Sequence, residues 1–526
     1  MMRPPFRSAA PAVPAVSPTR AGTVPAPSLP REARRRAVVV GSGFGGLAAA
    51  ARLAHDGWEV EILERHDVPG GRGGRWVSEG FTFDTGPSLV MMTEYWHALF
   101  RHLGRRLEDY LDLVQVDPCY RIHFPDGTWH DRTSVLNRLA AHCEQMEPGC
   151  TPRLMEYLAV TGRMYDEGLR FISRNMHKPQ AMLAGGIRGL LTGGALGDLQ
   201  KLVRRYFKDE RLQQSLSFQT LYLGLSPYES LAIYSLLPYV EIAGGIHYPM
   251  GGMHQLALAL EKVCSELGVT IRYGAEVERF ERAGARVTGC VLRGGEWVTG
   301  DIVVTNADLP YAYDKLLGEP YPGIERKRFS CSVVLLYLGT NREFPHLQHH
   351  NFVVGNDMKA ACEDMFVRHR MPDDPPFYVV ATTRTDPSQA PPGCENLFVL
   401  VLAPSQPADR SRWIDWSVEG PRVEAQTLER MERQLGMSGL RESIVTRKLV
   451  TPDTFTQRYG NLRGEAFGLS HNFMQIGYFR PHNRHRSIGN LYFVGQSTHP
   501  GCGVPMALIS AECVVDRIRE EQGVRR

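Results

Sequence analysis

The sequence predicts an α/β fold whose core is a Rossmann-like dinucleotide-binding domain near the amino terminus. Three observations predict it. Residues 38–40 are apolar and β-branched, which is typical of a buried parallel strand. A G-x-G-x-x-G pattern, from Gly41 to Gly46, follows at once and opens an alanine-rich helical segment. A second strand at 60–63 then ends in Glu64, roughly 20 residues on, where an acid can bind a ribose hydroxyl.

The glycine-rich turn is expected to hold a pyrophosphate. Gly41 permits the tight turn, Gly43 lets the backbone approach phosphate, and Gly46 lets the helix pack against the strand. Phe44 lies within the same turn, so we count it among the binding residues. The start of the helix adds free N–H groups and a partial positive charge that favour an anion. A glycine-rich turn without a ligand explains this combination less well.

Length, charge and cysteine content narrow the function classes. The chain has 526 residues, which favours two intimately joined domains over one core. With 60 basic and 57 acidic residues the formal charge is +3, which argues against a dedicated nucleic-acid binder. We expect no transmembrane helix, because no run of about 18 apolar residues occurs. The 10 cysteines form no C-x-x-C pair and predict reduced, structural thiols.

Residues 1–33 form a separate Pro- and Ala-rich segment. It carries Arg3, Arg7 and Arg20 and has no acid before Glu32. It lacks the apolar stretch of a secretory signal. We expect a disordered tail, with a transit peptide as the alternative.

A second glycine-rich stretch follows Glu64. Arg65 begins it, and it contains Gly70, Gly71 and Arg72 before the strand at 81–84. Its glycines indicate backbone packed close to a flat or phosphorylated group, and Arg72 could pair with phosphate. The alternative is a flexible surface loop with solvated arginines. Gly86 and Pro87 then turn the chain after the strand.

The carboxyl-terminal region repeats the strand–turn–helix pattern. A strand at 491–494 is ended by Gly495, and a turn of small residues leads to Pro505, which suits the first position of a helix running to about residue 520. The free amides of its first turn, those of Met506 and Ala507 among them, would point at whatever lies beneath.

The segment from 96 to about 245 has helical spacing and a different character. Its Gly- and Leu-rich part, 183–196, is flanked by basic residues and could lie on an anionic bilayer surface; a helical cap with a solvated basic face is the alternative. The apolar run 231–240 could line a hydrocarbon channel, although such runs are more often core.

Metal and hydrolase sites are not expected. The histidine groups lack acid or thiol partners, and one of them lies among arginines. No G-x-S-x-G elbow of a serine hydrolase is present. The histidines concerned are His346, His349, His350, His482 and His485.

Taken in succession, these motifs resemble the bacterial and fungal phytoene desaturases, flavin-dependent carotenoid desaturases of the wider amine-oxidase-like flavoprotein group. The resemblance covers nearly all of the chain after the tail. Residues 89–92, 218–224 and 245–248 look most like the branch that acts on the shorter diapophytoene chain. The motifs that carry the resemblance are 41–46, Glu64, 70–72, 81–87, 218–224, 251–253, 479–483, 490–495 and 499–505.

The resemblance implies FAD as cofactor and a discontinuous organisation. The FAD-binding domain would comprise 34–95, 246–310 and 451–526. An interleaved α+β substrate domain with a helical, membrane-facing part would comprise 96–245 and 311–450. In the family the helix start at Pro505 faces the flavin ring, and Val277 lies at the adenine end. Gln496 stands where the wider group often carries an acid, which makes its phosphate-side role uncertain. The implied cofactor-binding residues are Gly41, Gly43, Phe44, Gly46, Glu64, Arg65, Gly71, Arg72, Gly86, Pro87, Val277, Asn306, Gly495, Gln496, Val504, Pro505 and Met506.

The implied reaction removes a hydride and a proton from neighbouring carbons of a linear C40 or C30 isoprenoid. Flavin accepts the hydride, and electrons leave to oxygen or a membrane quinone. The family's acid and arginine lie near 147–153, where this chain keeps Arg153 but has Cys150 and Thr151 in place of an acid. We take His499, Glu147 and Arg153 as candidate catalytic residues, with Glu156 and Glu241 as further candidate bases.

The resemblance also implies a location and partners. The protein is expected to bind peripherally at the cytoplasmic side of a bacterial membrane, with a lipid surface and a long polyene as partners and a homo-oligomer left open. Alternatives are a related carotenoid oxidase, ketolase or hydratase, a hydroxycarotenoid desaturase, a flavin amine oxidase, and an isoprenoid-binding carrier without redox activity. The intact glycine turn with Glu64 speaks against a carrier.

Overall fold

A five-stranded parallel sheet forms the first part of the fold in this computed structural model, which describes residues 35–184 and 194–523. Its strands come from three distant parts of the chain, so the amino- and carboxyl-terminal segments share one sheet. The strand order is β19 (Leu491–Phe493), β13 (Ile302–Thr305), β1 (Arg36–Val40), β2 (Glu59–Leu63) and β9 (Thr270–Arg272).

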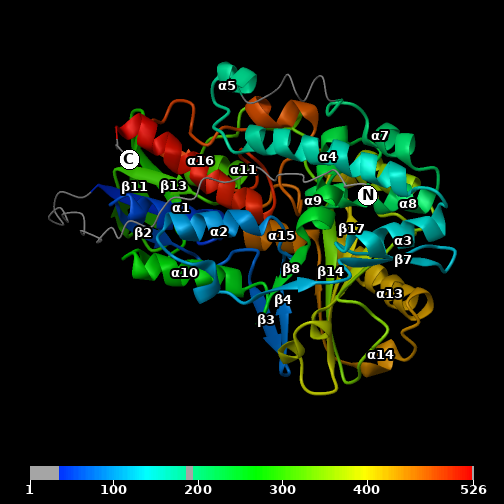
Figure 1. The fold of residues 1–526 in the computed structure, drawn as a ribbon. Helices are drawn as coiled ribbons and strands as arrows, with labels where there is room; N and C mark the ends of the chain where they lie inside the picture. Colours follow the sequence, from blue (N-terminus) through cyan, green and yellow to red (C-terminus); the bar gives the residue numbers. More distant parts are fainter. Residues whose placement is uncertain (1–34, 185–193, 524–526) are drawn as a thin grey trace. The chain divides into compact units, whose positions relative to one another are not determined.

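Three helices pack against this sheet. They are α1 (Phe44–His55), α10 (Gln255–Glu266) and α16 (Val504–Gln522). α1 contacts both of the others, and α1 and α16 lie side by side in Figure 1. The alanines at 48–51 are fully buried, because only small side chains fit between α1 and its neighbours.

A seven-stranded mixed sheet lies in the second part of the fold. All its neighbouring pairs are antiparallel except β15–β6, which joins residues 120–123 to residues 350–353. The strand order is β18 (Ile444–Val450), β14 (Ser332–Thr340), β17 (Glu395–Ala403), β16 (Phe377–Ala381), β15 (His350–Val353), β6 (Tyr120–His123) and β7 (Trp129–Arg132).

Smaller strand sets connect these sheets. The three-stranded sheet consists of β10 (Val277–Ala283), β11 (Arg286–Leu292) and β12 (Trp297–Thr299). Two antiparallel pairs are β3 (Arg75–Ser78) with β4 (Phe81–Asp84), and β5 (Leu113–Val116) with β8 (Ile246–Pro249).

Of the remaining α-helices in the described residues, α2 (Thr93–His102) packs on α16, and the others flank the second part of the fold or connect the sheets. The others before β8 are α3 (Leu136–Met146), α4 (Thr151–Ile172), α5 (Pro179–Ala184), α7 (Leu199–Tyr206), α8 (Glu210–Ser215) and α9 (Leu236–Gly244). Those after it are α11 (Leu309–Tyr311), α12 (Met358–Glu363), α13 (Trp416–Gln434), α14 (Leu440–Ser443) and α15 (Pro452–Tyr459).

The expected parallel core is confirmed. Strands form at 36–40, 59–63 and 491–493, and a helix begins at Val504 with Pro505 in its first turn. The strands of the parallel sheet fall within the expected FAD-binding ranges, and those of the mixed sheet within the expected substrate ranges; the domain boundaries themselves stay predictions. Most of the Gly- and Leu-rich segment 183–196, and the tail 1–33, lie outside the described residues. Within the described ranges, no helix is both long and apolar enough to cross a bilayer.

Candidate cofactor and substrate site

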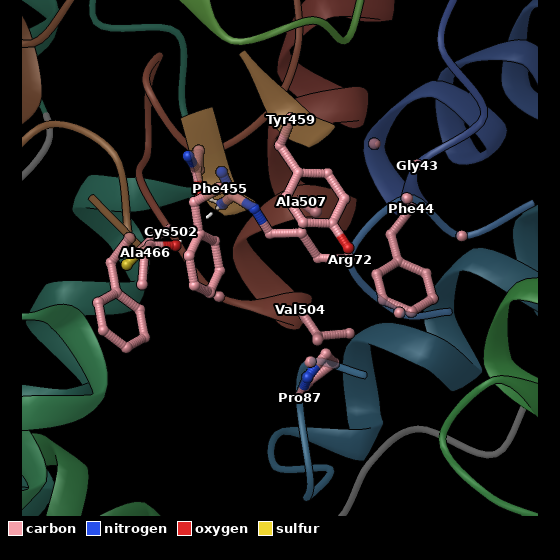
Figure 2. A pocket seen from close by; sticks show the side chains of 18 of the residues that line it. Gly43, Phe44, Arg72, Pro87, Phe455, Tyr459, Ala466, Cys502, Val504 and Ala507 are labelled. Atoms are coloured by element: carbon pink, nitrogen blue, oxygen red, sulfur yellow. Dashed lines mark hydrogen bonds between the residues drawn. The ribbon is translucent and has the colours of Figure 1, made fainter. Parts of the chain in front are cut away.

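One cavity of about 530 Å³ brings the two ends of the chain together. Its wall includes the glycine turn at 41–45 and the first turn of α16 at 504–507. Figure 2 shows Phe44, Pro87, Val504 and Tyr459 around the same open space. The two turns therefore line one cavity, as the cofactor assignment requires.

Asn306, just after β13, joins the carboxyl ends of β1 and β19 on either side of it. Its backbone N–H donates to Val40 O at 2.8 Å, and its side-chain amide donates to Val494 O at 2.9 Å. A Cβ on Gly43 would lie 2.4 Å from Asn306 Oδ1, so only glycine fits there. Likewise, a Cβ on Gly46 would lie 2.0 Å from Gly41 O, which explains the close packing of α1 on β1.

Glu64 fixes the shape of the glycine turn from the end of β2. One carboxylate oxygen accepts from Ser42 N at 2.7 Å and from Ser42 Oγ at 2.8 Å. The other accepts from His66 N at 2.9 Å. Glu64 also lines the cavity, so a carboxylate held rigidly on backbone N–H groups is available to a ribose.

Arg72 connects the second glycine-rich stretch to the carboxyl-terminal region. Its guanidinium donates to Ala466 O at 3.0 Å and to Asn461 Oδ1 at 2.8 Å, and it also bonds Gln496. It lies over the ring of Tyr459 (Figure 2). These contacts disagree with the alternative of a solvated loop arginine, since the side chain of Arg72 is bonded at the cavity wall. Its contact with phosphate stays a prediction.

The amino-terminal end of α16 faces the cavity. Val504, Pro505, Met506 and Ala507 all line it. The first intrahelical bond runs from Ala507 N to Gly503 O at 3.0 Å, so the prediction of a free Ala507 amide was wrong, because the helix already bonds at this position. The partial positive charge of the helix is carried by the residues before Ala507. This end of the helix can stabilise negative charge on a group in the cavity.

Asp308 is a cavity residue that the sequence reasoning did not single out. It accepts from Ser497 Oγ at 2.7 Å and from the side-chain amide of Gln496 at 3.3 Å. Burial raises the pKa of its carboxyl. Gln496, whose phosphate-side role was uncertain, therefore places its side chain between Arg72 and Asp308. Asp308 lies three residues after the end of β13, and a polar side chain in the turn after a parallel strand was the signal for it.

Arg480 supports the turn that carries Gln496. It is fully buried, and its guanidinium donates to Thr498 O at 2.8 Å, Gln475 O at 3.0 Å and further main-chain carbonyls, among them that of Gln496. Burial lowers its pKa to about 10. The backbone carbonyls thus compensate a buried cation directly behind the cavity wall.

We call the part of the cavity lined by the glycine turn at 41–45, Glu64 and the start of α16 the nucleotide half. Beyond it, the cavity continues as an apolar chamber. The mixed sheet forms one wall through β14, β15, β16 and β17. Of the charged side chains in the described lining, Glu64, Arg65, Glu276 and Asp308 lie in the nucleotide half, and Arg72, over the ring of Tyr459, lies where the two parts of the cavity meet. The chamber is lined by Leu89, Met91, Tyr120, Phe218, Leu221, Tyr222, Leu237, Val333, Leu335, Phe352, Tyr378, Phe398, Leu400, Leu402, Phe455 and Tyr459.

The structure brings nearly all of the expected cofactor-binding residues to this cavity. Each of them lines it except Gly46 and Gly495, which flank it in α1 and after β19. Of the apolar run 231–240, the lining includes only Leu237, while Tyr234 donates to His471 O at 2.5 Å. The individual contacts of these residues with FAD stay predictions.

The candidate catalytic residues lie outside the described lining. His499 bonds Ile172 O through Nε2 at 3.1 Å, and burial lowers its pKa to about 4. Glu147 accepts from Lys208 N at 2.7 Å and pairs with Arg153, whose Nε donates to Tyr206 O at 2.8 Å. Glu147 and Arg153 therefore tie helices together, and the geometry offers no substrate contact for any of the three.

The histidine groups make other contacts. His346 bonds Leu435 O, His482 bonds Tyr478 O and His485 pairs with Glu319. Within the described ranges, no group of three or more His, Cys, Asp or Glu is placed to hold a metal ion.

Comparison with known proteins agrees with this geometry. The profile of the flavin containing amine oxidoreductase family matches residues 44–519. The chain is 45% identical over 498 residues to a zeta-carotene-forming phytoene desaturase of Myxococcus xanthus, with 92% of this chain and 94% of that protein covered. The chain belongs to the phytoene desaturase family. It is a flavin-containing oxidoreductase, and FAD is the cofactor that this family implies.

Two further relatives and a solved structure are less similar to this phytoene desaturase family protein than the Myxococcus xanthus enzyme is. It is 34% identical to a 4,4'-diapolycopene oxygenase of Methylomonas sp (92% of this chain, 98% of that protein) and 34% identical to a 4,4'-diapophytoene desaturase of Staphylococcus haemolyticus (92% and 98%). The diapophytoene branch is therefore not specifically favoured. A putrescine oxidase structure aligns with a TM-score of 0.59 at 14% identity, covering 92% of this chain and 99% of the other, which shows a shared fold.

Proposed function

We propose that the protein is an FAD-dependent carotenoid desaturase that inserts double bonds into a linear C40 polyene of the phytoene type. The observation that carries the proposal is the apolar chamber that opens directly from the nucleotide half of the cavity. A chain with only C–H bonds can be desolvated there without leaving a polar group unpaired. The higher identity to a phytoene desaturase than to the diapophytoene enzyme supports the longer substrate.

When bound, FAD supplies the hydride acceptor. The chamber wall from Phe218, Phe352 and Phe398 holds the chain and excludes water. The start of α16 at Val504–Met506 stabilises the negative charge that hydride transfer brings to this part of the cavity. Positioning and electrostatics are the contributions of the protein, and electrons then leave to a quinone or oxygen.

A related carotenoid-oxidising activity is the second candidate, because the diapolycopene oxygenase relative is 34% identical. An amine oxidase is supported by the broad family profile and the shared fold, but the chamber lining among described residues offers no carboxylate for an ammonium group. The cavity has the expected FAD-binding groups, which also argues against a carrier without redox activity.

The substrate class requires delivery from a bilayer, and we assign membrane contact to the surface formed by Phe473, Met474 and Phe479. Their side chains are 42%, 59% and 37% exposed. α5 packs beside this surface, and Arg328, exposed and joined to Gln475 through its backbone N–H, adds a basic side chain. Apolar side chains beside basic ones suit an anionic lipid surface.

Vesicle sedimentation tests this surface. Met474→Ser together with Phe473→Ser should weaken binding to phosphatidylglycerol vesicles about tenfold, because two apolar side chains that the bilayer would bury are lost. Val418→Ser, on α13 and also highly exposed, is the matched control and should leave binding unchanged. Equal weakening by both variants would assign the contact to general surface hydrophobicity.

Anaerobic flavin bleaching tests the activity. The FAD-loaded protein is mixed with phytoene, neurosporene or diapophytoene in vesicles, or with a primary amine, and its visible flavin absorption is followed. We expect phytoene to bleach the flavin and to yield a product with additional conjugated double bonds. Bleaching by the amine alone would contradict the proposal.

A further inference from the structure

A buried carboxylate lies directly behind the chamber wall. Glu241, in α9, is fully buried, and so is Arg132, whose guanidinium lies 3.3 Å from Glu241 Oε2. Arg132 also donates to Pro238 O at 3.2 Å. Glu241 accepts from the side-chain amide of Gln219 at 3.1 Å. An ion pair sequestered in this way gains little stability over an apolar pair, so its presence beside a hydrocarbon chamber needs another explanation.

Tyr222 connects this carboxylate to the chamber. Tyr222 lines the cavity, and its hydroxyl donates to Glu241 Oε1 at 2.9 Å. Tyr120, also in the lining, stacks on the ring of Tyr222 with centroids 6.2 Å apart. The only route that these contacts give Glu241 to a bound molecule is through the Tyr222 hydroxyl.

Tyr378 and Ser88 continue this row of hydroxyl groups from the chamber toward the nucleotide half. Tyr378 packs near Tyr120, with ring centroids 6.1 Å apart, and its hydroxyl lies 3.1 Å from Ser88 Oγ. Ser88 follows Pro87, which lies opposite Val504 at the cavity (Figure 2). The tyrosine cluster therefore lies at the part of the chamber that adjoins the expected flavin site.

We propose that Tyr222 and Glu241 together accept the proton in the desaturation reaction. This inference rests on the proposed function. One substrate C–H bond breaks with transfer of a hydride to the flavin. The C–H bond on the neighbouring carbon breaks with its electron pair forming the new C=C bond. That proton goes to the Tyr222 oxygen as the Tyr222 hydroxyl proton goes to Glu241 Oε1, and it returns to solvent by the same path after the product leaves.

The charge balance of the cluster suits this role. Burial raises the pKa of Glu241, opposed by Arg132, Tyr222 and Gln219, which makes the carboxylate a stronger base than a solvated one. The other groups facing it are Cys119, Tyr120, Tyr157, Tyr222 and Tyr378, and burial raises the pKa of each, to about 12 for Cys119. His350, which bonds Tyr378, has a pKa well below its usual range because of burial. The neighbouring thiol and hydroxyl groups therefore keep their protons, which leaves Glu241 as the proton acceptor of this cluster.

Two variants separate this role from a structural one. Tyr222→Phe keeps the ring and the Glu241–Arg132 pair, and Glu241→Gln keeps the shape of the side chain. Tyr157→Phe is the matched control, since Tyr157 faces Glu241 but lies outside the described lining. Thermal melting and FAD affinity of each variant, measured without substrate, verify that fold and cofactor site are intact.

The measurements are anaerobic single-turnover flavin bleaching and product formation with phytoene in vesicles, as a function of pH and in heavy water. Both Tyr222→Phe and Glu241→Gln should slow turnover by about 10²–10³-fold, the range of general base catalysis. The wild-type rate should rise with pH through one carboxyl transition that Glu241→Gln abolishes, and the solvent isotope effect should fall in Tyr222→Phe. Turnover of Tyr222→Phe within about twofold of wild type, or an unchanged pH profile in Glu241→Gln, would overturn the inference. If wild type itself is not bleached by any polyene, the proposed function fails first.

Discussion

The side-chain amide of Asn306 donates to the carbonyl of Val494 at 2.9 Å, and this bond joins two strands that are far apart in the sequence. It lies directly beneath the glycine turn, because Asn306 also bonds Val40 through its backbone. The amino-terminal turn, the end of β13 and the carboxyl-terminal turn are thus held as one unit. The cofactor assignment depends on this unit.

Asn306→Ala should reduce stability by removing that link. Val494 O would lose a partner in a part-buried site, which costs about 1–3 kcal/mol of the free energy of unfolding. Urea unfolding of the FAD-free protein measures it. Asn356→Ala, at an exposed position, is the control and should stay within about 0.5 kcal/mol of wild type. Equal values for the two variants would show that Asn306 does not join the strands in solution.

Gly43→Val should impair FAD binding. Its side chain would overlap Asn306 Oδ1 and occupy the expected place of the pyrophosphate, and such overpacking in the FAD-bound state costs about 1–3 kcal/mol, or about 5–150-fold in FAD affinity. Fluorescence titration of the FAD-free protein gives the dissociation constant. Gly489→Ala has open space around the added Cβ and serves as the control. A yellow Gly43→Val protein with full FAD occupancy at low FAD concentration would count against the placement of the pyrophosphate.

Arg72→Ala separates two contributions of one side chain. Loss of a charge-assisted phosphate contact should weaken FAD binding by about 1.5–3 kcal/mol. Loss of the bonds to Ala466, Asn461 and Gln496 should also lower the melting temperature without FAD. A lower melting temperature with unchanged FAD affinity would assign Arg72 to the link alone.

The stability should depend on the ionisation of Asp84. Burial raises its pKa from 3.8 to about 6, opposed by hydrogen bonds from the Met253 and His254 amides and Tyr248. Between these values the folded protein retains a proton that the unfolded chain has released, so stability falls as pH rises, by about 3 kcal/mol. The difference in unfolding free energy between wild type and Asp84→Asn should show this fall between about pH 4 and 6. A difference that is constant across this range would place a charged Asp84 in the fold.

The nucleotide half of the site could be predicted from the sequence, because local patterns encode it. The glycines at 41–46, Glu64 after β2 and Pro505 at the start of α16 each follow from one segment. The roles of Asp308 and Arg480 could not be predicted, nor could the bond from Tyr222 to Glu241, a candidate base in the sequence, since they arise from contacts between distant segments. Glu241 did leave a signal, as a single acid at the end of an apolar run, but only the fold shows that Tyr222 links it to the chamber.

For the candidate catalytic residues His499, Glu147 and Arg153, the sequence pattern did not predict a place at the cavity correctly. His499 lies within the turn of small residues before Pro505, yet its ring bonds Ile172 O outside the described lining. Glu147 and Arg153 are close in sequence and do pair, but they do so at helix ends. Proximity along the chain identified a real contact without identifying its purpose.

The central claim is that both ends of the chain bind the same FAD. Hydrogen–deuterium exchange of the protein with and without FAD tests it most directly, read on peptides covering 41–46 and 495–507. We predict that FAD slows exchange in both peptides with the same dependence on FAD concentration, because one molecule contacts both turns. Protection of 41–46 with no change at 495–507 at saturating FAD would contradict the account.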